Sequence, residues 1–238
     1  MSGYKECICS AEEAVQKVKS GDRIVFSHAC GEPRVLPATL MKRVDELTGV
    51  QIVHMVPMGE ALYCRPEYAG SFRHVALFSG APTREAIWEN RADYVPYVFS
   101  EIPFLFDSVL PVDVAMVTVS PPDKNGFCSL GVSVDYTKKA VESAKIVIAE
   151  INKAMPRTHG DSFVHVSEID CFVEVDIPIA ELKATELTDV EINIGKYVTE
   201  LIEDGSCLQL GIGGIPDAVL KNLGSLKDLG VHSEMISD

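Results

Sequence analysis

A glycine-rich loop near the C-terminal end of the sequence is the segment best suited to binding chemistry. It lies between a predicted strand and a predicted helix and comprises Gly211, Ile212, Gly213, Gly214 and Ile215, followed by Pro216. Glycine lets the backbone approach a ligand closely, and proline suits the first turn of a helix. Because free N–H groups and the helix dipole both favour an anion there, we expect the loop to hold a negative charge. The alternative is a tight turn that serves packing alone.

Glu234 is the side chain best placed to react at that loop. It follows the loop by one predicted helix and one predicted strand, so the two strand ends should lie side by side. The carboxyl ends of strands border the ligand crevice of open α/β sheets. A carboxylate beside backbone N–H donors suits acyl transfer, with the glutamate as nucleophile and the donors holding the oxyanion. A solvated surface glutamate is the alternative.

A dinucleotide site is a second interpretation of the same residues. Gly211 and Gly213 begin a G-x-G-x-x-G pattern, and Glu234 comes about 20 residues later, where a Rossmann fold has its ribose-binding acid. Pro216 occupies the third glycine position, which disfavours the pattern. An NAD-dependent oxidoreductase with a degenerate loop therefore stays open as an alternative of another class.

Two further side chains are candidates for a substrate pocket. His28 ends the first predicted strand, and we expect it to face the crevice and bind a substrate carboxylate; a structural histidine is the alternative. Gln209 precedes the glycine loop, and we expect it to hydrogen-bond near Glu234 or to be a neutral polar group of the core. We expect no metal, because neither a second cysteine pair nor a nearby histidine completes a ligand set with Cys7 and Cys9.

The elements that must position these residues alternate along the chain. Short runs rich in Val, Ile and Phe predict buried strands at Arg23–Ser27, Val50–Val56, His74–Phe78, Val112–Ser120, Ile146–Glu150 and Cys171–Ile177. Helical patterns lie between several of them, at Leu36–Leu47, Arg84–Ala92 and Tyr136–Ala144. This alternation predicts an α/β fold with an open, mostly parallel sheet and flanking helices.

The opening of the chain recurs near its end. Ser10 begins a capping box, and the helix after it is followed by Gly21, a strand and another helix. Thr188 begins a second capping box, and its helix is followed by Gly205, a strand and the glycine-rich loop. The sequence therefore predicts one complete α/β unit and the opening of a second.

This repeat defines the expected domains. Aligning the two repeated glycines sets His28 against Ile212. We expect residues 1–185 to form an N-terminal α/β domain and residues 186–238 to begin a second, pseudo-repeated domain that is truncated. The second copy has predicted strands only at Cys207–Leu210 and Gly230–Met235, too few for a sheet covered on both faces. Exposed apolar surface should therefore remain on it.

Composition excludes several classes of protein. The chain has 238 residues, of which 47% are hydrophobic and 24% charged, so we expect a globular protein. A net charge of −14 without a basic run argues against nucleic-acid binding. No apolar stretch approaches the ~20 residues of a membrane span, and we expect no signal peptide. Seven cysteines at irregular spacing predict reduced thiols and a cytoplasmic location.

Together, the loop and the glutamate resemble the acetyl-CoA hydrolase/CoA-transferase family. The resemblance rests on Gly211–Asp217 and His232–Met235, with further matches at Ser100–Pro103, Ser120–Gly126 and Met155–Thr158. It runs along the whole chain. Family members are longer, so we expect this sequence to correspond to their N-terminal half and activity to need the C-terminal half.

The resemblance implies a CoA-transferase/sugar-phosphate-isomerase-like fold and transfer of CoA between short carboxylic acids of the 4-hydroxybutyrate, butyrate or acetate type. In the family, the glutamate matched by Glu234 forms an acyl anhydride and then a glutamyl-CoA thioester. The loop matched by Gly211–Ile215 contacts CoA, and the N–H matched by Ile212 helps to hold the oxyanion. Acetyl-CoA hydrolysis is the alternative within the family. The implied partners are acyl-CoA and short carboxylic acids, with CoA as a substrate rather than a cofactor and a homodimer as the assembly.

Overall fold

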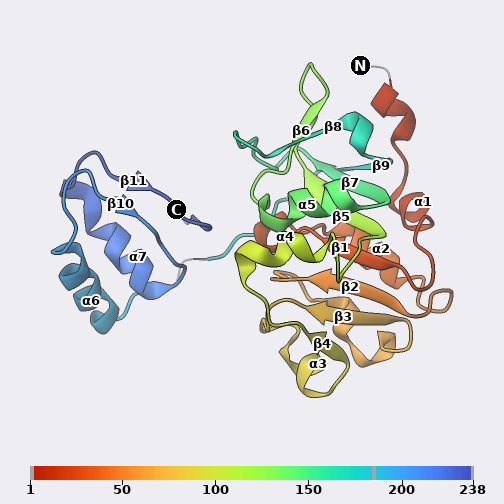
Figure 1. Ribbon diagram of the computed structural model, residues 1–238, viewed down its shortest axis with the longest axis horizontal. Coiled ribbons are helices and arrows are strands. Elements are labelled where there is room, and N and C mark those ends of the chain that lie inside the picture. The colour runs from red at the N-terminus through yellow and green to blue at the C-terminus, as the bar shows by residue number, and fades with distance from the viewer. Residues whose placement is uncertain (1–2, 184–185, 237–238) are drawn as a thin grey trace. The chain divides into compact units, whose positions relative to one another are not determined.

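The chain divides into two compact units, Met1–Glu181 and Leu182–Asp238. The computed structural model describes residues 3–183 and 186–236 of them. The first unit contains the large sheet and His28, and the second contains the glycine loop and Glu234 (Figure 1).

One sheet of seven parallel strands forms the centre of the first unit. The strands are β1 (Arg23–Phe26), β2 (Val50–His54), β3 (Phe72–Ala76), β4 (Ala92–Tyr94), β5 (Val114–Val119), β7 (Ile146–Asn152) and β9 (Cys171–Val175). Their order across the sheet is β4-β3-β2-β1-β5-β7-β9, and all neighbouring pairs are parallel. Strand β5 is buried along its whole length, as a strand covered on both faces must be. The predicted α/β fold with an open parallel sheet is confirmed.

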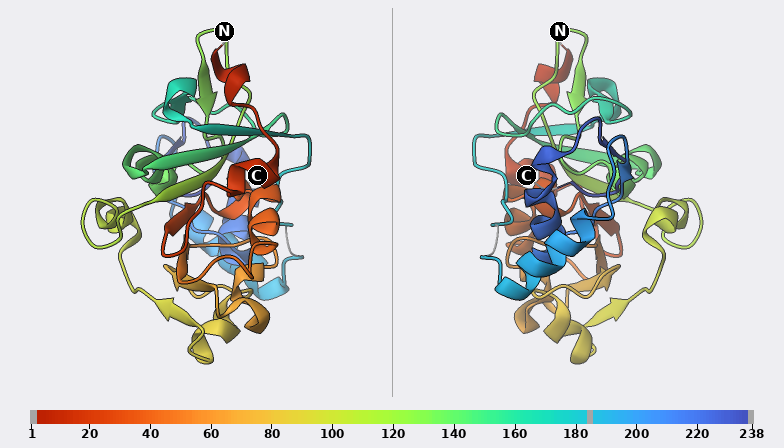
Figure 2. Two further views of the ribbon diagram at one scale, coloured as in Figure 1. Left: turned by 90° about the vertical axis from the view of Figure 1, so that its right-hand side faces the viewer. Right: turned by 90° about the vertical axis from the view of Figure 1, so that its left-hand side faces the viewer.

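Helices cover both faces of this sheet because successive residues of each strand point to opposite faces. The helices are α1 (Ala11–Val15), α2 (Val35–Met41), α3 (Arg84–Trp88), α4 (Ile102–Leu105) and α5 (Asp135–Ser143). In β1, Ile24 and Phe26 pack into the hydrophobic cluster that contains α1 and α2. Val25, between them, packs into the cluster that contains α4 and α5 on the other face. Figure 2 shows the sheet of the first unit in two further views.

The order of the strands changes direction next to β1. Strands β2, β3 and β4 follow on one side of it, whereas β5, β7 and β9 lie on the other. The loops after β1 and β5 therefore diverge at the carboxyl edge, where open α/β sheets bind their ligands. His28 lies in the loop after β1. A small antiparallel pair, β6 (Phe127–Ser129) with β8 (Phe163–His165), extends from the chain after β5.

The described part of the second unit contains two α-helices and two short parallel strands. They are α6 (Asp189–Thr199), β10 (Cys207–Leu208), α7 (Gly214–Lys221) and β11 (Gly230–Val231). The capping box predicted at Thr188 begins α6. Gly195 of α6 lies so close to Ala218 of α7 that a Cβ atom would stand 2.7 Å from the Ala218 carbonyl oxygen. The helices therefore contact each other through their smallest residues.

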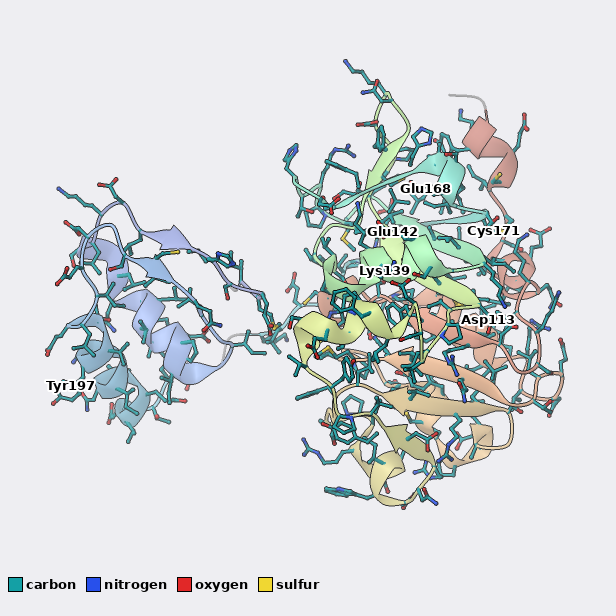
Figure 3. The ribbon with its side chains drawn as sticks, in the orientation of Figure 1. Asp113, Lys139, Glu142, Glu168, Cys171 and Tyr197 are labelled. Atoms are coloured by element: carbon teal, nitrogen blue, oxygen red, sulfur yellow. The ribbon has the colours of Figure 1, made fainter. Side chains whose placement is uncertain are left out.

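Several apolar side chains of α6 and of the turn after it are exposed within the described structure. Tyr197, labelled in Figure 3, is 69% exposed, and Leu201 just beyond the helix is 83% exposed. The side of α6 that contacts α7 is instead the one that contains Gly195. A helix with an uncovered apolar face has not buried the surface that normally stabilises it.

Both units open with the same hydrogen-bond pattern. The N–H of Gly21 donates to the Thr48 carbonyl oxygen, and the N–H of Gly205 donates to that of Lys227, each at 2.9 Å. Both glycines have a positive φ, 85° and 79° respectively. Each is followed by a strand that pairs in parallel with the next strand of its own unit.

Several predicted boundaries differ from the structure. Strands β10 and β11 stop at Leu208 and Val231, earlier than predicted, because a side-chain hydroxyl takes the hydrogen bonds of Leu210 that would continue the ladder. The helix predicted over Leu36–Leu47 ends at Met41 and continues as turns. Strands β4, β6 and β8 were not predicted, because three residues are too few to give a periodic signal.

Candidate active site

The glycine loop connects β10 to α7 and presents unused backbone donors. Gly213 has φ 119° and ψ 177°, a conformation that is essentially restricted to glycine. The first helical hydrogen bond runs from the Asp217 N–H to the Gly213 carbonyl oxygen at 3.1 Å. No hydrogen bond between described residues uses the N–H groups of Gly211–Ile215. These donors at the start of an eight-residue helix are available to an anion.

Glu234 lies just beyond β11, beside this loop. Leu208 and Val231 are partners in the parallel register, and the His232 N–H donates to the Leu208 carbonyl oxygen at 2.9 Å. Gly211 and Glu234 each come three residues after these partners, so the loop and the glutamate leave neighbouring strand ends. The Glu234 side chain is exposed. The structure thus places the Glu234 backbone and the glycine loop at neighbouring strand ends.

Gln209 stands at the exit of β10 and is exposed. Its side-chain amide donates to the carbonyl oxygen of the adjacent Leu210 at 3.4 Å. No hydrogen bond to Glu234 is formed among the described residues. Gln209 therefore lies two residues before Gly211, and no described residue donates a hydrogen bond to its side-chain oxygen.

His28 lies in the first unit and is buried, with 5% of its surface exposed. Its Nε2 is 2.8 Å from the Asp135 carboxylate, and its ring stacks on Tyr136 with centroids 4.8 Å apart. The Ser133 hydroxyl accepts the His28 backbone N–H at 3.1 Å. Its Nδ1 is buried and has no hydrogen-bond partner among the described residues. One ring nitrogen is thus held by a carboxylate, while no described residue hydrogen-bonds the other.

A cavity of about 260 Å³ opens at the carboxyl ends of β1 and β2, and sequence reasoning missed it. Glu32 lines it and accepts the Met58 N–H at 2.9 Å. Burial raises the pKa of the Glu32 carboxyl. His54 lines it too, with Nδ1 2.7 Å from the Tyr63 hydroxyl, and burial lowers its pKa well below 6.5. The signal available in the sequence was that both residues follow or end a strand, as His28 does.

A second buried carboxylate, that of Glu150 in β7, holds the start of α2. Its oxygens accept the N–H groups of Arg34, Val35 and Leu36 at 3.1, 2.8 and 2.7 Å. Burial raises the pKa of the Glu150 carboxyl, and the three N–H groups oppose that shift. The carboxylate satisfies donors that the first turn of a helix leaves unpaired. It fixes the loop that carries His28 from its far end.

Neither a metal site nor a membrane helix is found in the part of the chain that the structure describes. Groups of three or more potential metal ligands are absent from residues 3–183 and 186–236. Cys9 points instead to Cys171, with the two sulfur atoms 3.3 Å apart. Within the same described ranges, no helix combines the length and the hydropathy needed to cross a bilayer.

A family model and the curated relatives of this chain point to the same protein family. Residues 1–182 match the model of the acetyl-CoA hydrolase/transferase N-terminal domain. The chain is 56% identical over 236 residues to 4-hydroxybutyrate coenzyme A transferase from Clostridium kluyveri, a match that covers 99% of this chain and 55% of that protein. It therefore spans about half the length of the curated relatives that it matches.

Solved structures agree with this match. The crystal structure of a 4-hydroxybutyrate CoA-transferase from Porphyromonas gingivalis is 40% identical, with a TM-score of 0.84 over 99% of this chain and 56% of that chain. RipA from Yersinia pestis is 30% identical, with a TM-score of 0.94 over 98% of this chain and 57% of that chain. The parallel sheet, the match over residues 1–182 and these relatives together show that the chain belongs to the acetyl-CoA hydrolase/transferase family.

Proposed function

We propose that the whole protein carrying this sequence transfers CoA between short carboxylic acids, with Glu234 as the nucleophile. The observation that carries the proposal is the adjacency of Glu234 to the unused N–H groups of Gly211–Ile215. A relative that is 56% identical is named for CoA transfer to 4-hydroxybutyrate. We infer acids of the 4-hydroxybutyrate, butyrate and acetate type as substrates.

The chemistry proceeds in two exchanges. The Glu234 carboxylate attacks the thioester carbonyl of the acyl-CoA, and the C–S bond breaks to give an acyl-glutamyl anhydride and free CoA thiolate. The thiolate then attacks the glutamyl carbonyl, which releases the first acid as carboxylate and leaves a glutamyl-CoA thioester. The acceptor acid reverses both steps, so atoms and charge balance in a ping-pong cycle.

The glycine loop supplies what a weak carboxylate nucleophile needs. Negative charge develops on the thioester oxygen during attack, and N–H donors at the Ile212 region are oriented before the reaction begins. Removing one such donor in other enzymes costs about 3–4 kcal/mol of transition-state stabilisation. The remaining N–H groups of Gly211–Ile215 contact CoA.

We propose that His28 and Gln209 each contact the substrate. No described residue hydrogen-bonds the buried Nδ1 of His28, and the carboxylate of a bound acid would satisfy it. Asp135 on the other nitrogen would hold the imidazole in place for this role. Gln209 at the mouth of the loop would hydrogen-bond the reacting glutamyl group. His28→Ala should therefore raise the KM for the acid more than it lowers kcat.

Hydrolysis of acetyl-CoA is the alternative within the family, since water instead of an acid would attack the same anhydride.

The dinucleotide interpretation has weaker support. Pro216 stands where that pattern needs its third glycine, and the relatives from Clostridium kluyveri and Porphyromonas gingivalis are named as CoA-transferases. We further propose a cytoplasmic homodimer in which residues 186–238 begin a second, pseudo-repeated domain. The repeated Gly21 and Gly205 hydrogen bonds support the repeat.

The experiment is a pair of substitutions in the whole protein. Glu234→Gln keeps the shape of the side chain but removes its charge, and should abolish transfer while leaving CoA affinity within about tenfold. Glu234→Asp retracts the carboxylate and should reduce the rate sharply without abolishing it. Glu203→Gln, at an exposed glutamate of the same unit, is the matched control and should be silent. Normal transfer by Glu234→Gln would overturn the proposal. So would binding of NAD by the parent protein that is lost in Glu234→Gln.

A further inference from the structure

The parallel ladder between β10 and β11 predicts where its next hydrogen bonds should fall. The Gly230 N–H donates to the Ser206 carbonyl oxygen, and the His232 N–H donates to that of Leu208, both at 2.9 Å. A parallel ladder repeats every two residues along each strand. The next bonds should therefore join the Leu210 N–H to the His232 carbonyl oxygen, and the Glu234 N–H to the Leu210 carbonyl oxygen.

Neither bond forms, because the hydroxyl of Ser233 replaces both. Its oxygen accepts the Leu210 N–H at 3.3 Å, and its proton is donated to the Leu210 carbonyl oxygen at 2.8 Å. No hydrogen bond among the described residues then uses the Glu234 N–H. The hydroxyl thus ends the ladder one residue before the glutamate. Its oxygen atom lies between the backbones of the two strands at this point.

A side-chain hydroxyl also lies at the end of the equivalent ladder in the first unit, although there it bridges the two strands. Phe26 matches Leu210 when Gly21 is aligned with Gly205. Its carbonyl oxygen accepts a hydrogen bond from the Tyr136 hydroxyl at 2.9 Å, and the same hydroxyl accepts the Met55 N–H at 3.4 Å. A side-chain hydroxyl thus lies between the diverging strand ends in both units. Because different residues supply it, the arrangement is a feature of the strand ends and not of one local sequence.

We propose that Ser233 is a positioning residue that holds Glu234 at the correct distance from the glycine loop. The inference rests on the proposed function of Glu234. Without the hydroxyl, the Leu210 groups would pair with the backbone of β11, and the Glu234 peptide would be drawn into the ladder. Leu210 directly precedes Gly211, and Ser233 directly precedes Glu234. The contact between Ser233 and Leu210 therefore holds the residue before the loop against the residue before the nucleophile.

The test compares Ser233→Ala with Ser233→Thr in the whole protein. Ser233→Ala should lower kcat about 100-fold, because small misplacements of a reacting group cost this much, while the KM for acyl-CoA stays within about threefold. Ser233→Thr keeps the hydroxyl and should restore kcat to within about tenfold of the parent. Ser206→Ala is the matched control: its hydroxyl accepts the Glu203 N–H at 3.2 Å at the start of β10, and kcat should not change.

Hydrogen exchange provides a readout independent of activity. The Leu210 amide should exchange at different rates in the parent and in Ser233→Ala, and Ser233→Thr should match the parent. Equal kcat losses in the alanine and threonine variants, or full activity of Ser233→Ala, would overturn the positioning role. Retained transfer by Glu234→Gln would instead overturn the function of Glu234. The two failures are therefore distinguishable.

Discussion

Glu150 and Leu36 are joined by a buried hydrogen bond of 2.7 Å between carboxylate Oε1 and backbone nitrogen, although 114 residues separate them in the sequence. The same carboxylate accepts the N–H groups of Arg34 and Val35. A strand that lies two positions from β1 in the sheet thus determines where α2 begins. The loop that carries His28 is held between β1 and this anchored helix.

Replacing Glu150 by alanine should destabilise the protein by about 3 kcal/mol or more, because three buried N–H groups lose their acceptor. The free energy of unfolding, measured by denaturant titration, checks this. Glu142→Ala removes an exposed glutamate of α5 and should change stability by less than about 0.5 kcal/mol. Equal stability of the two variants would show that water replaces the carboxylate at no cost.

His74 should make the protein less stable in mild acid. Burial lowers its pKa from 6.5 to about 4, so between these values the unfolded chain binds a proton that the folded chain does not. Stability should therefore fall as the pH decreases from 6.5 towards 4, by about 3 kcal/mol from this group, and be independent of it above pH 6.5.

The variant His74→Gln keeps a donor for the Ile52 carbonyl oxygen, the partner of His74 Nδ1 at 3.0 Å, but does not titrate. The acid loss of unfolding free energy should be smaller in this variant by that amount. His159→Gln, at an exposed imidazole, is the control and should leave the pH profile unchanged. A profile of His74→Gln as steep as that of the parent would mean that other groups cause the acid loss.

Gly213→Ala should impair the loop more than it impairs the fold. At φ 119° and ψ 177° a side chain is strained by about 1–3 kcal/mol, although no atom lies within 4 Å of its Cβ position. We expect weaker CoA binding and slower transfer, measured by titration and initial rates. Gly224→Ala also enters open space, but without a positive φ, and should be silent. Full activity of Gly213→Ala would argue that the loop conformation is not used.

The sequence predicts those features that depend on local pattern. Runs of Val, Ile and Phe predict the central strands, and the capping boxes at Ser10 and Thr188 predict two helix starts, because these signals lie within a few residues. Its glycines and the repeat likewise bring the loop and Glu234 to neighbouring strand ends. Contacts between distant residues gave no such signal, and the pairing of His28 with Asp135 spans 107 residues.

The contact of Ser233 with Leu210 escaped prediction for a different reason. The alternation of apolar residues around Gln209 predicts a strand over Cys207–Leu210, and pairing with the next strand would then continue as far as Leu210. A single hydroxyl ended the ladder early by competing for the backbone groups of Leu210. Such competition depends on the rotamer of one side chain, which hydrophobic patterning does not report.

The most direct measurement of the central claim is mass spectrometry of the whole protein after incubation with an acyl-CoA and no acceptor acid. The account predicts a mass increase equal to CoA less one water, located by proteolysis on the peptide that contains Glu234. Addition of a short carboxylic acid should remove it, and Glu234→Gln should never acquire it. An active protein that shows no adduct, or that carries it on another residue, would contradict the account.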